Sequence, residues 1–128
     1  MKMDISSRAD IEQLVLQFYE KVKADKTIGF IFTEVVEMKW EKHIPIIADF
    51  WETILLDNPV YTKNAMEVHY DLNNRMPLQK AHFDSWVHLF TSTVDDLFEG
   101  RIAELAKTRA RSIAAVMLFK MESGKKGL

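Results

Sequence analysis

The sequence predicts a single all-α domain. Along four long stretches, apolar residues recur at spacings of three and four, which is the period of one face of a helix. Only four Gly and three Pro interrupt the 128 residues, and no stretch forms a convincing strand. A chain of this length can bury a substantial core. We expect an ordered core over about residues 8–121 and a frayed tail at 122–128.

The first helix is expected to begin at a capping box. Ser7 can accept a hydrogen bond from an early backbone N–H, and Asp10 can reach back to the cap. Tyr19 falls at the edge of the apolar stripe and its hydroxyl needs a partner. Gly29 marks a break, after which residues 30–32 form a turn or one helical turn with Phe side chains directed inward. The stripe itself consists of Ile11, Leu14, Val15, Phe18 and Val22.

The second helix is predicted over residues 38–56, with Pro45 inside it. Proline removes a backbone donor, so either the regular helix begins near Pro45 or it is distorted there. His43 falls on the predicted apolar face, where a histidine is more often a satisfied core residue than a ligand. The residues of this face are Trp40, His43, Ile47, Phe50, Trp51, Ile54 and Leu55.

Three further elements complete the predicted fold. Residues 63–70, which contain His69, can form at most two turns of helix, and a loop ending near Pro77 follows. A third long helix is predicted over residues 78–98, and Gly100 separates it from a last helix. The inward residues are Phe83, Trp86, Val87, Phe90, Val94 and Leu97 in the third helix, and Ile102, Leu105, Ile113, Val116 and Met117 in the last.

The composition excludes several classes of protein. A formal net charge of −2 without a clustered basic face predicts neither nucleic acid nor an anionic membrane as a partner. The absence of Cys excludes disulfides, thiolate metal sites, iron–sulfur clusters and thiol nucleophiles. No signal pattern or membrane-spanning run is recognisable, so we expect a soluble, cytoplasmic protein.

The four histidines differ in their contexts. His88 shares a helix face with polar residues and is expected at the surface, and His82 in a first helical turn is expected to be structural or exposed. His43 has the two readings given above, and His69 could be no more than a residue of a loop or helix end. Gly-rich phosphate loops, zinc spacings and nucleophile elbows are absent. Aromatic residues at helical spacing more often form a core than a cofactor site.

The order of several short runs resembles the truncated haemoglobins of group III. The resemblance extends over about residues 8–120, and its most specific parts are the pair Phe50 and Trp51 and the run His82–Trp86. The chain contains no Gly-Gly pair, which agrees with group III. The matching runs are Phe18–Glu20, Gly29–Phe32, Trp40–Pro45, Asp49–Trp51 and His82–Trp86, with His69 before the last.

The resemblance implies a two-over-two helical sandwich that holds haem b, with His69 as the proximal iron ligand. It matches Phe32 to an aromatic residue on the haem face and Ile47 to an apolar position on the distal wall. The positions matched to distal, ligand-stabilising residues are Tyr19, His43 and Trp86. A neutral imidazole as fifth ligand leaves the sixth iron position open for a diatomic gas such as oxygen, nitric oxide or carbon monoxide.

The sequence leaves three functions open. The first is a redox enzyme, a nitric oxide dioxygenase or a peroxidase-like protein, since polar distal groups favour chemistry on bound oxygen. The chain shows no flavin or nicotinamide domain, so sustained catalysis would need an electron donor from another protein. The second is an oxygen carrier or gas sensor without turnover. The third is a haem-free helical interaction module.

Overall fold

The computed structural model describes residues 2–31, 40–61 and 78–126. In this part of the chain all regular structure is helical, which confirms the all-α prediction, and the four long helices match the predicted ones in number and order. None of these helices is long and apolar enough to cross a membrane. The helices are α1 (Arg8–Ala24), α2 (Trp40–Leu56), α4 (Lys80–Leu97) and α5 (Arg101–Lys126).

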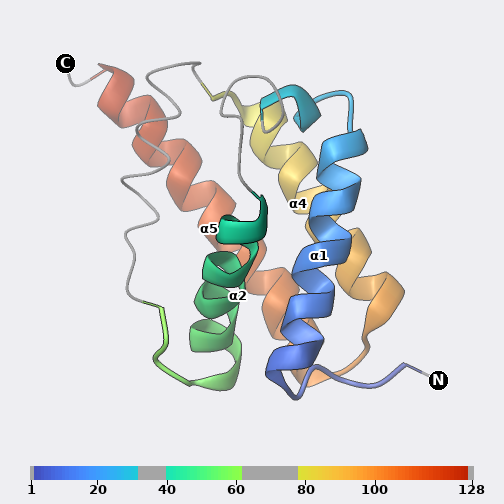
Figure 1. Cartoon of the computed structure of the whole chain (residues 1–128). Helices are drawn as coiled ribbons and strands as arrows, with labels where there is room; N and C mark the ends of the chain where they lie inside the picture. The colour runs from blue at the N-terminus through green and yellow to red at the C-terminus, as the bar shows by residue number, and fades with distance from the viewer. Residues whose placement is uncertain (1, 32–39, 62–77, 127–128) are drawn as a thin grey trace.

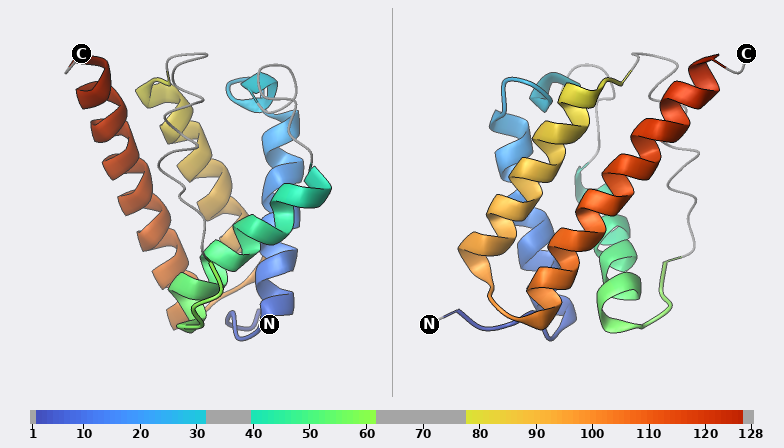
Figure 2. Two further views of the ribbon diagram at one scale, coloured as in Figure 1. Left: turned by 60° about the vertical axis from the view of Figure 1, so that its left-hand side comes forward. Right: turned by 180° about the vertical axis from the view of Figure 1, so that it is seen from behind.

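The helices form two packed pairs (Figures 1 and 2). Helix α1 packs against α2, and α4 packs against α5 as an antiparallel hairpin whose helices diverge toward the C-terminal end of α5. The two pairs meet mainly where α1 packs against α4, whereas α2 and α5 touch only sparsely. This is a two-over-two arrangement with its core between the pairs.

Helix α1 begins at the predicted capping box. The Asp10 backbone N–H donates to Ser7 Oγ at 3.2 Å, and the Ser7 N–H donates to Asp10 Oδ2 at 3.2 Å. Two early donors are therefore satisfied reciprocally, which stabilises the first turn. All five residues of the predicted stripe, and Tyr19 beside them, are buried in the main apolar cluster.

The turn after α1 differs in part from its prediction. Ile28 and Ile31 are each 2 % exposed, but Phe30 faces outward with 37 % exposure, so the expectation that Phe30 points inward is wrong. Residues three apart share a helical face, and the two isoleucines occupy the inner one. A Cβ on Gly29 would lie 2.8 Å from the carbonyl oxygen of Lys23, so only glycine fits at this distance.

Helix α2 begins at Trp40 and continues through Pro45. Of the two alternatives for Pro45, the one with the proline inside the helix is therefore observed. Because proline has no backbone N–H, the hydrogen bond from residue 45 to the carbonyl of Glu41 in the first turn is missing.

Helix α5 buries Met117 as predicted, but most of its other buried residues are alanines that the prediction did not include. Val116 is 50 % exposed, so its assignment to the inner face is wrong, while Ile102, Leu105 and Ile113 are only partly buried. Small side chains at helical spacing let α5 approach α4 closely. The helical backbone continues past residue 121 to Lys126. The buried residues of α5 are Ala103, Ala106, Ala110, Ala114, Met117 and Met121.

The N-terminal segment caps α5 from a distance in sequence. Asp4 Oδ2 accepts from the Ile102 N–H at 3.0 Å, and Asp4 Oδ1 accepts from the Ala103 N–H at 2.8 Å. Gly100 makes this approach possible, because it has a φ of 147° and a Cβ there would lie 2.5 Å from Asp4 Cγ. The segment before α1 and the turn before α5 are thereby held together.

Candidate functional site

Tyr19 and Trp86 meet between α1 and α4. Tyr19 is 8 % exposed and Trp86 is partly buried, and their side chains form a hydrogen bond. The indole N–H can only donate, so the Tyr19 oxygen is the acceptor. Two of the three residues expected in the distal pocket, 67 positions apart in the sequence, are thus in direct contact.

The environment of Tyr19 keeps its phenol protonated. Burial raises the pKa of Tyr19 to about 12, although the hydrogen bond from Trp86 acts in the opposite direction. A phenol that accepts a hydrogen bond still carries one O–H with which it can donate. Tyr19 is therefore a hydrogen-bond donor, and not an anion, at neutral pH.

Stacked aromatic rings hold this pair in place. Phe18 meets Tyr19 edge to face at 4.7 Å between ring centroids and Trp86 at 5.8 Å. Phe90, which is fully buried, stacks on Trp86 at 5.7 Å and on Trp51 at 4.6 Å. Rings packed at these distances have few alternative rotamers, so the Trp86 indole is held in a defined orientation.

His43 lies apart from the pair. Its side chain is exposed, so the pattern-based expectation that it lies on the apolar face of α2 is wrong. The buried face of α2 is centred on Ala48, Trp51 and Leu55, and His43 falls at its edge. Ile47 is partly buried and packs against the cluster that contains Tyr19.

Two expected site residues lie outside the described part of the chain. These are Phe32, matched to the haem face, and His69, the expected iron ligand. Within the described residues no group of three or more His, Cys, Asp or Glu side chains could hold a metal ion. A haem iron needs only one axial side chain from the protein, so this finding concerns other metal sites.

A hollow of about 510 Å³ lies between α2 and α5, the two helices that touch sparsely. Cofactor sites typically have volumes of roughly 300–1,000 Å³ and mostly apolar walls. Ile113 and Met117, which line the hollow, belong with Trp86 to one apolar cluster. The sequence marked these residues as helix faces only, because periodicity does not distinguish a face toward a cavity from one toward a helix. The lining residues are Phe50, Ile54, Arg109, Ser112, Ile113, Val116 and Met117.

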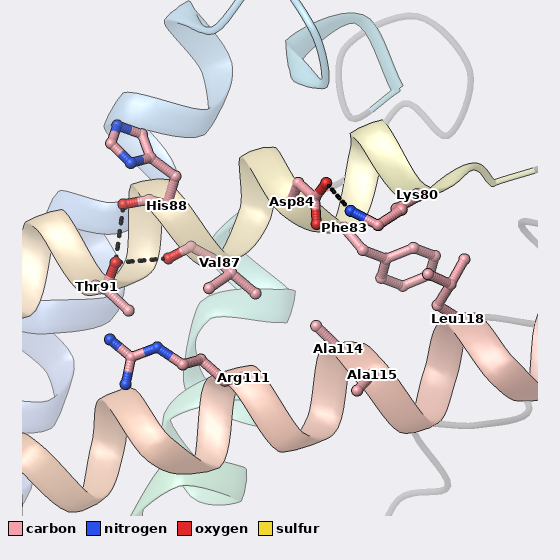
Figure 3. A pocket seen from close by; sticks show the side chains of 10 residues that line it. All are labelled: Lys80, Phe83, Asp84, Val87, His88, Thr91, Arg111, Ala114, Ala115 and Leu118. Carbon is pink, nitrogen blue, oxygen red and sulfur yellow. Dashed lines mark hydrogen bonds and ion pairs between the residues drawn. The ribbon is translucent and has the colours of Figure 1, made fainter.

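A second hollow, of about 480 Å³, lies where α4 and α5 diverge (Figure 3). Phe83 and Leu118 form an apolar end, and Lys80 pairs with Asp84 at 2.7 Å along the rim. His88 is exposed, as predicted, and borders this hollow. None of the described residues expected to bind a ligand lines either hollow, but the hollow between α2 and α5 is bordered by α2, the helix that carries His43 and Ile47, and is therefore the better candidate.

His82 has a structural role, as expected. Its Nδ1 accepts a hydrogen bond from the Gln79 backbone N–H at 2.9 Å, which caps the start of α4. Burial lowers the pKa of His82, which favours the neutral ring needed for this acceptor role.

The comparisons with known proteins agree with this geometry. No family model matches the chain. The chain is 29 % identical over 118 residues to the group 3 truncated haemoglobin ctb of Campylobacter jejuni, covering 90 % of this chain and 91 % of that one. It superposes on the crystal structure of the group III truncated haemoglobin from Campylobacter jejuni with a TM-score of 0.83 and 27 % identity, over 94 % of this chain and 95 % of the other.

The helices and their packing define a globin-like fold of the truncated haemoglobin type. Within that class, the chain is a relative of the group III truncated haemoglobins, as the sequence resemblance indicated.

Proposed function

We propose that this protein binds haem b in the hollow between α2 and α5, with His69 as the axial iron ligand, and that the haem captures diatomic gases beside Tyr19 and Trp86. Both comparisons match this chain to a truncated haemoglobin of Campylobacter jejuni, which supports haem binding. The observation that carries the proposal is the meeting of Tyr19 and Trp86 within the main apolar cluster, because a phenol O–H oriented by the indole in apolar surroundings suits a small polarised ligand.

The chemistry of the residues present fits the cofactor. Haem is flat and mostly apolar, and the hollow offers Phe50, Ile54 and Ile113 as apolar walls. Arg109 and Ser112 add polar groups at the same hollow, where the haem carboxylates would need solvent or a cation. When bound, haem supplies an iron with one open position for a gas molecule.

The protein side chains supply hydrogen bonds to the captured molecule. Tyr19 donates its O–H, and Trp86 fixes the phenol through the indole N–H. A hydrogen bond to a polarised ligand in a dry pocket is worth roughly 1–3 kcal/mol, or about a tenfold to hundredfold change in its dissociation. His43, exposed on the first turns of α2, serves as a further donor at the pocket entrance.

The polar donors favour redox chemistry, as a nitric oxide dioxygenase or a peroxidase-like protein, over simple storage. An electron donor from another protein is then required for repeated turnover. Supplying a reductant and excess nitric oxide separates the two cases. Repeated conversion to nitrate supports an enzyme, whereas one stoichiometric oxidation indicates an oxygen carrier or gas sensor.

Haem uptake by the purified protein tests the central proposal. We expect wild type to bind added haemin with a Soret band, and His69→Ala to lose most of this retention because the axial bond to iron is removed. His88→Ala is the matched control, since His88 is exposed and outside the proposed pocket. If wild-type protein takes up no haemin, the haem assignment is wrong and the haem-free helical module remains.

A further inference from the structure

The guanidinium of Arg8 joins the first turn of α1 to the middle of α2. Its Nη1 lies 2.5 Å from Asp49 Oδ1 and 2.9 Å from Glu52 Oε1. Its Nη2 donates to the backbone carbonyl of Pro45 at 3.3 Å. One side chain therefore contacts α2 at three points spread over two helical turns.

The polar cluster around Arg8 also includes a residue of α1 and a residue that follows α2. Arg8 Nε lies 2.9 Å from Glu12 Oε2 on its own helix, and Asn58 Nδ2 donates to Glu52 Oε2. Glu52 is only 8 % exposed, and the hydrogen bonds from Arg8 and then Asn58 hold the pKa of Glu52 below its ordinary value. A buried carboxylate is tolerated only while its partners stay in position, so the cluster constrains the geometry of the two helices.

The contacts of Arg8 flank the part of α2 that faces the site. Ile47 and Ala48 lie in sequence between Pro45 and Asp49, and both pack into the cluster that contains Tyr19. Pro45 has no backbone N–H, so the first turn of α2 contains one internal hydrogen bond fewer than a regular helix. The missing hydrogen bond belongs to the first turn of α2, and the three points that Arg8 contacts follow directly after that turn.

We propose that Arg8 is a positioning residue that fixes α2 against α1 and thereby sets how closely Ile47 approaches the pair of Tyr19 and Trp86. The effect on a captured ligand rests on the proposed function, whereas the effect on helix geometry does not. We call the contacts of the Arg8 guanidinium with Asp49, Glu52 and the Pro45 carbonyl the fork. Loss of the fork releases the middle of α2, and the first turns of the helix, including His43, move with it.

A purely stabilising role predicts a different outcome. Partly exposed ion pairs contribute little to stability, and their loss ordinarily leaves the native geometry unchanged. Lys107 offers the comparison, because it pairs with Asp95 at 2.6 Å and with Glu104 at 2.9 Å near the α4–α5 turn and contacts neither α1 nor α2 in these pairs. Lys107→Met therefore removes two ion pairs without touching the α1–α2 contact.

Distances between spin labels test the geometry without reference to haem. The chain has no Cys, so Gln17→Cys on α1 and Lys42→Cys on α2 give two exposed attachment sites. Pulsed electron paramagnetic resonance on the full chain without added haem should give a shifted or broadened distance distribution in Arg8→Met, and an unchanged one in Lys107→Met. An unchanged distribution in Arg8→Met overturns the proposal. If Arg8→Met does not fold, Asp49→Ala removes one contact of the Arg8 guanidinium and is judged by the same criterion.

Vibrational spectroscopy tests the link to the ligand pocket. In haem-loaded protein we expect Arg8→Met to shift the C–O stretching frequency of bound carbon monoxide and to change oxygen dissociation by about twofold to thirtyfold, the range typical of residues distant from a ligand. Arg8→Lys should recover only part of the effect, because an ammonium cannot form the fork. A changed label distance with an unchanged C–O frequency would reject the link to the pocket. Failure of wild type to bind haem would instead reject the proposed function and leave the label result decisive for the helix geometry.

Discussion

At the scale of single residues, the hydrogen bond from Trp86 to Tyr19 determines what each side chain can do. An indole donates one hydrogen bond, so while Trp86 donates to Tyr19 it orients the phenol and does not itself contact a ligand. Under the proposed function, Tyr19 rather than Trp86 is the direct donor to the ligand. The two residues act as a unit, and the effects of removing them should not add.

Substitutions at this pair test the unit. Tyr19→Phe and Trp86→Phe should each speed oxygen dissociation from haem-loaded ferrous protein by about tenfold to a hundredfold, the value of one lost hydrogen bond in a dry pocket. The double variant should exceed the larger single effect only slightly. Stopped-flow displacement of oxygen by carbon monoxide measures the rates.

Tyr61→Phe is the matched control for Tyr19→Phe. It also loses a phenol hydroxyl, and its ring packs on Phe50 at 5.2 Å, whereas the rings of Tyr19 and Trp86 pack on Phe18 and Phe90. Its dissociation rate should equal that of wild type. Equal rates for wild type, Tyr19→Phe and Trp86→Phe would remove both residues as ligand-stabilising groups.

At the scale of elements, the start of α5 depends on a side chain almost a hundred residues earlier in the chain. Asp4 supplies two of the acceptors that the first turn of any helix lacks. Burial alone would raise the pKa of Asp4, but hydrogen bonds from the backbone N–H groups of Ile102, Ala103 and Ile5 lower it overall. The carboxylate form is therefore the one that the folded state prefers.

This cap makes part of the stability dependent on pH. Asp4→Ala should lower the free energy of unfolding at pH 7 by about 1 kcal/mol, as is typical for a lost N-cap. Because the folded-state pKa of Asp4 is below its ordinary value of 3.8, the difference between wild type and variant should be complete above that pH and shrink as the pH falls below it. Urea denaturation at several pH values measures the difference.

Glu99→Ala is the control for Asp4→Ala. Glu99 is an exposed acid in the same turn, and only its backbone N–H contacts the N-terminal segment, at 3.0 Å from the Met3 carbonyl. Its stability difference should be small at every pH. A pH-independent loss in Asp4→Ala would mean that the variant acts through packing and not through the charged cap.

The elements also show which features periodicity can predict. The inner face of α1 was predicted correctly from its large apolar residues, because burial of each of these side chains contributes a large favourable free energy. The inner face of α5 was predicted only in part: Met117 is buried, Val116 is not, and the buried alanines were missed, since alanine carries little hydrophobic signal and its burial depends on how closely α4 approaches. His43 was placed inward because it falls at the edge of an apolar stripe, where a shift of one residue changes exposure.

At the scale of the whole molecule, the contact between Tyr19 and Trp86 was beyond the reach of periodicity, because it depends on how two helices cross. The family resemblance predicted that the two residues belong to one site, and the fold comparison confirms that resemblance. The hollow between α2 and α5 had no sequence signal at all. It arises because each of these helices packs mainly on its own partner, which leaves apolar side chains facing each other across a gap.

A ligand in this hollow would join the two helix pairs, and a pair of matched variants tests its location. Val116 lines the hollow and is 50 % exposed, whereas Leu16 on α1 is 51 % exposed and does not line it. Val116→Glu should weaken haemin binding by about tenfold or more, because a carboxylate against an apolar ligand costs roughly 1–3 kcal/mol. Leu16→Glu should bind haemin as wild type does.

Haemin titration followed at the Soret band gives the affinities, and thermal unfolding with and without haemin gives an independent measure. Binding at a hundredfold excess over the dissociation constant stabilises the folded state by about 2.7 kcal/mol, and this increment should be present in Leu16→Glu and reduced in Val116→Glu. Equal weakening in both variants would mean that an added negative charge acts from anywhere on the surface. Full binding by Val116→Glu would place the haem away from α5. The haem site would then have to be sought on the α1 side of α2, where the Tyr19–Trp86 pair lies.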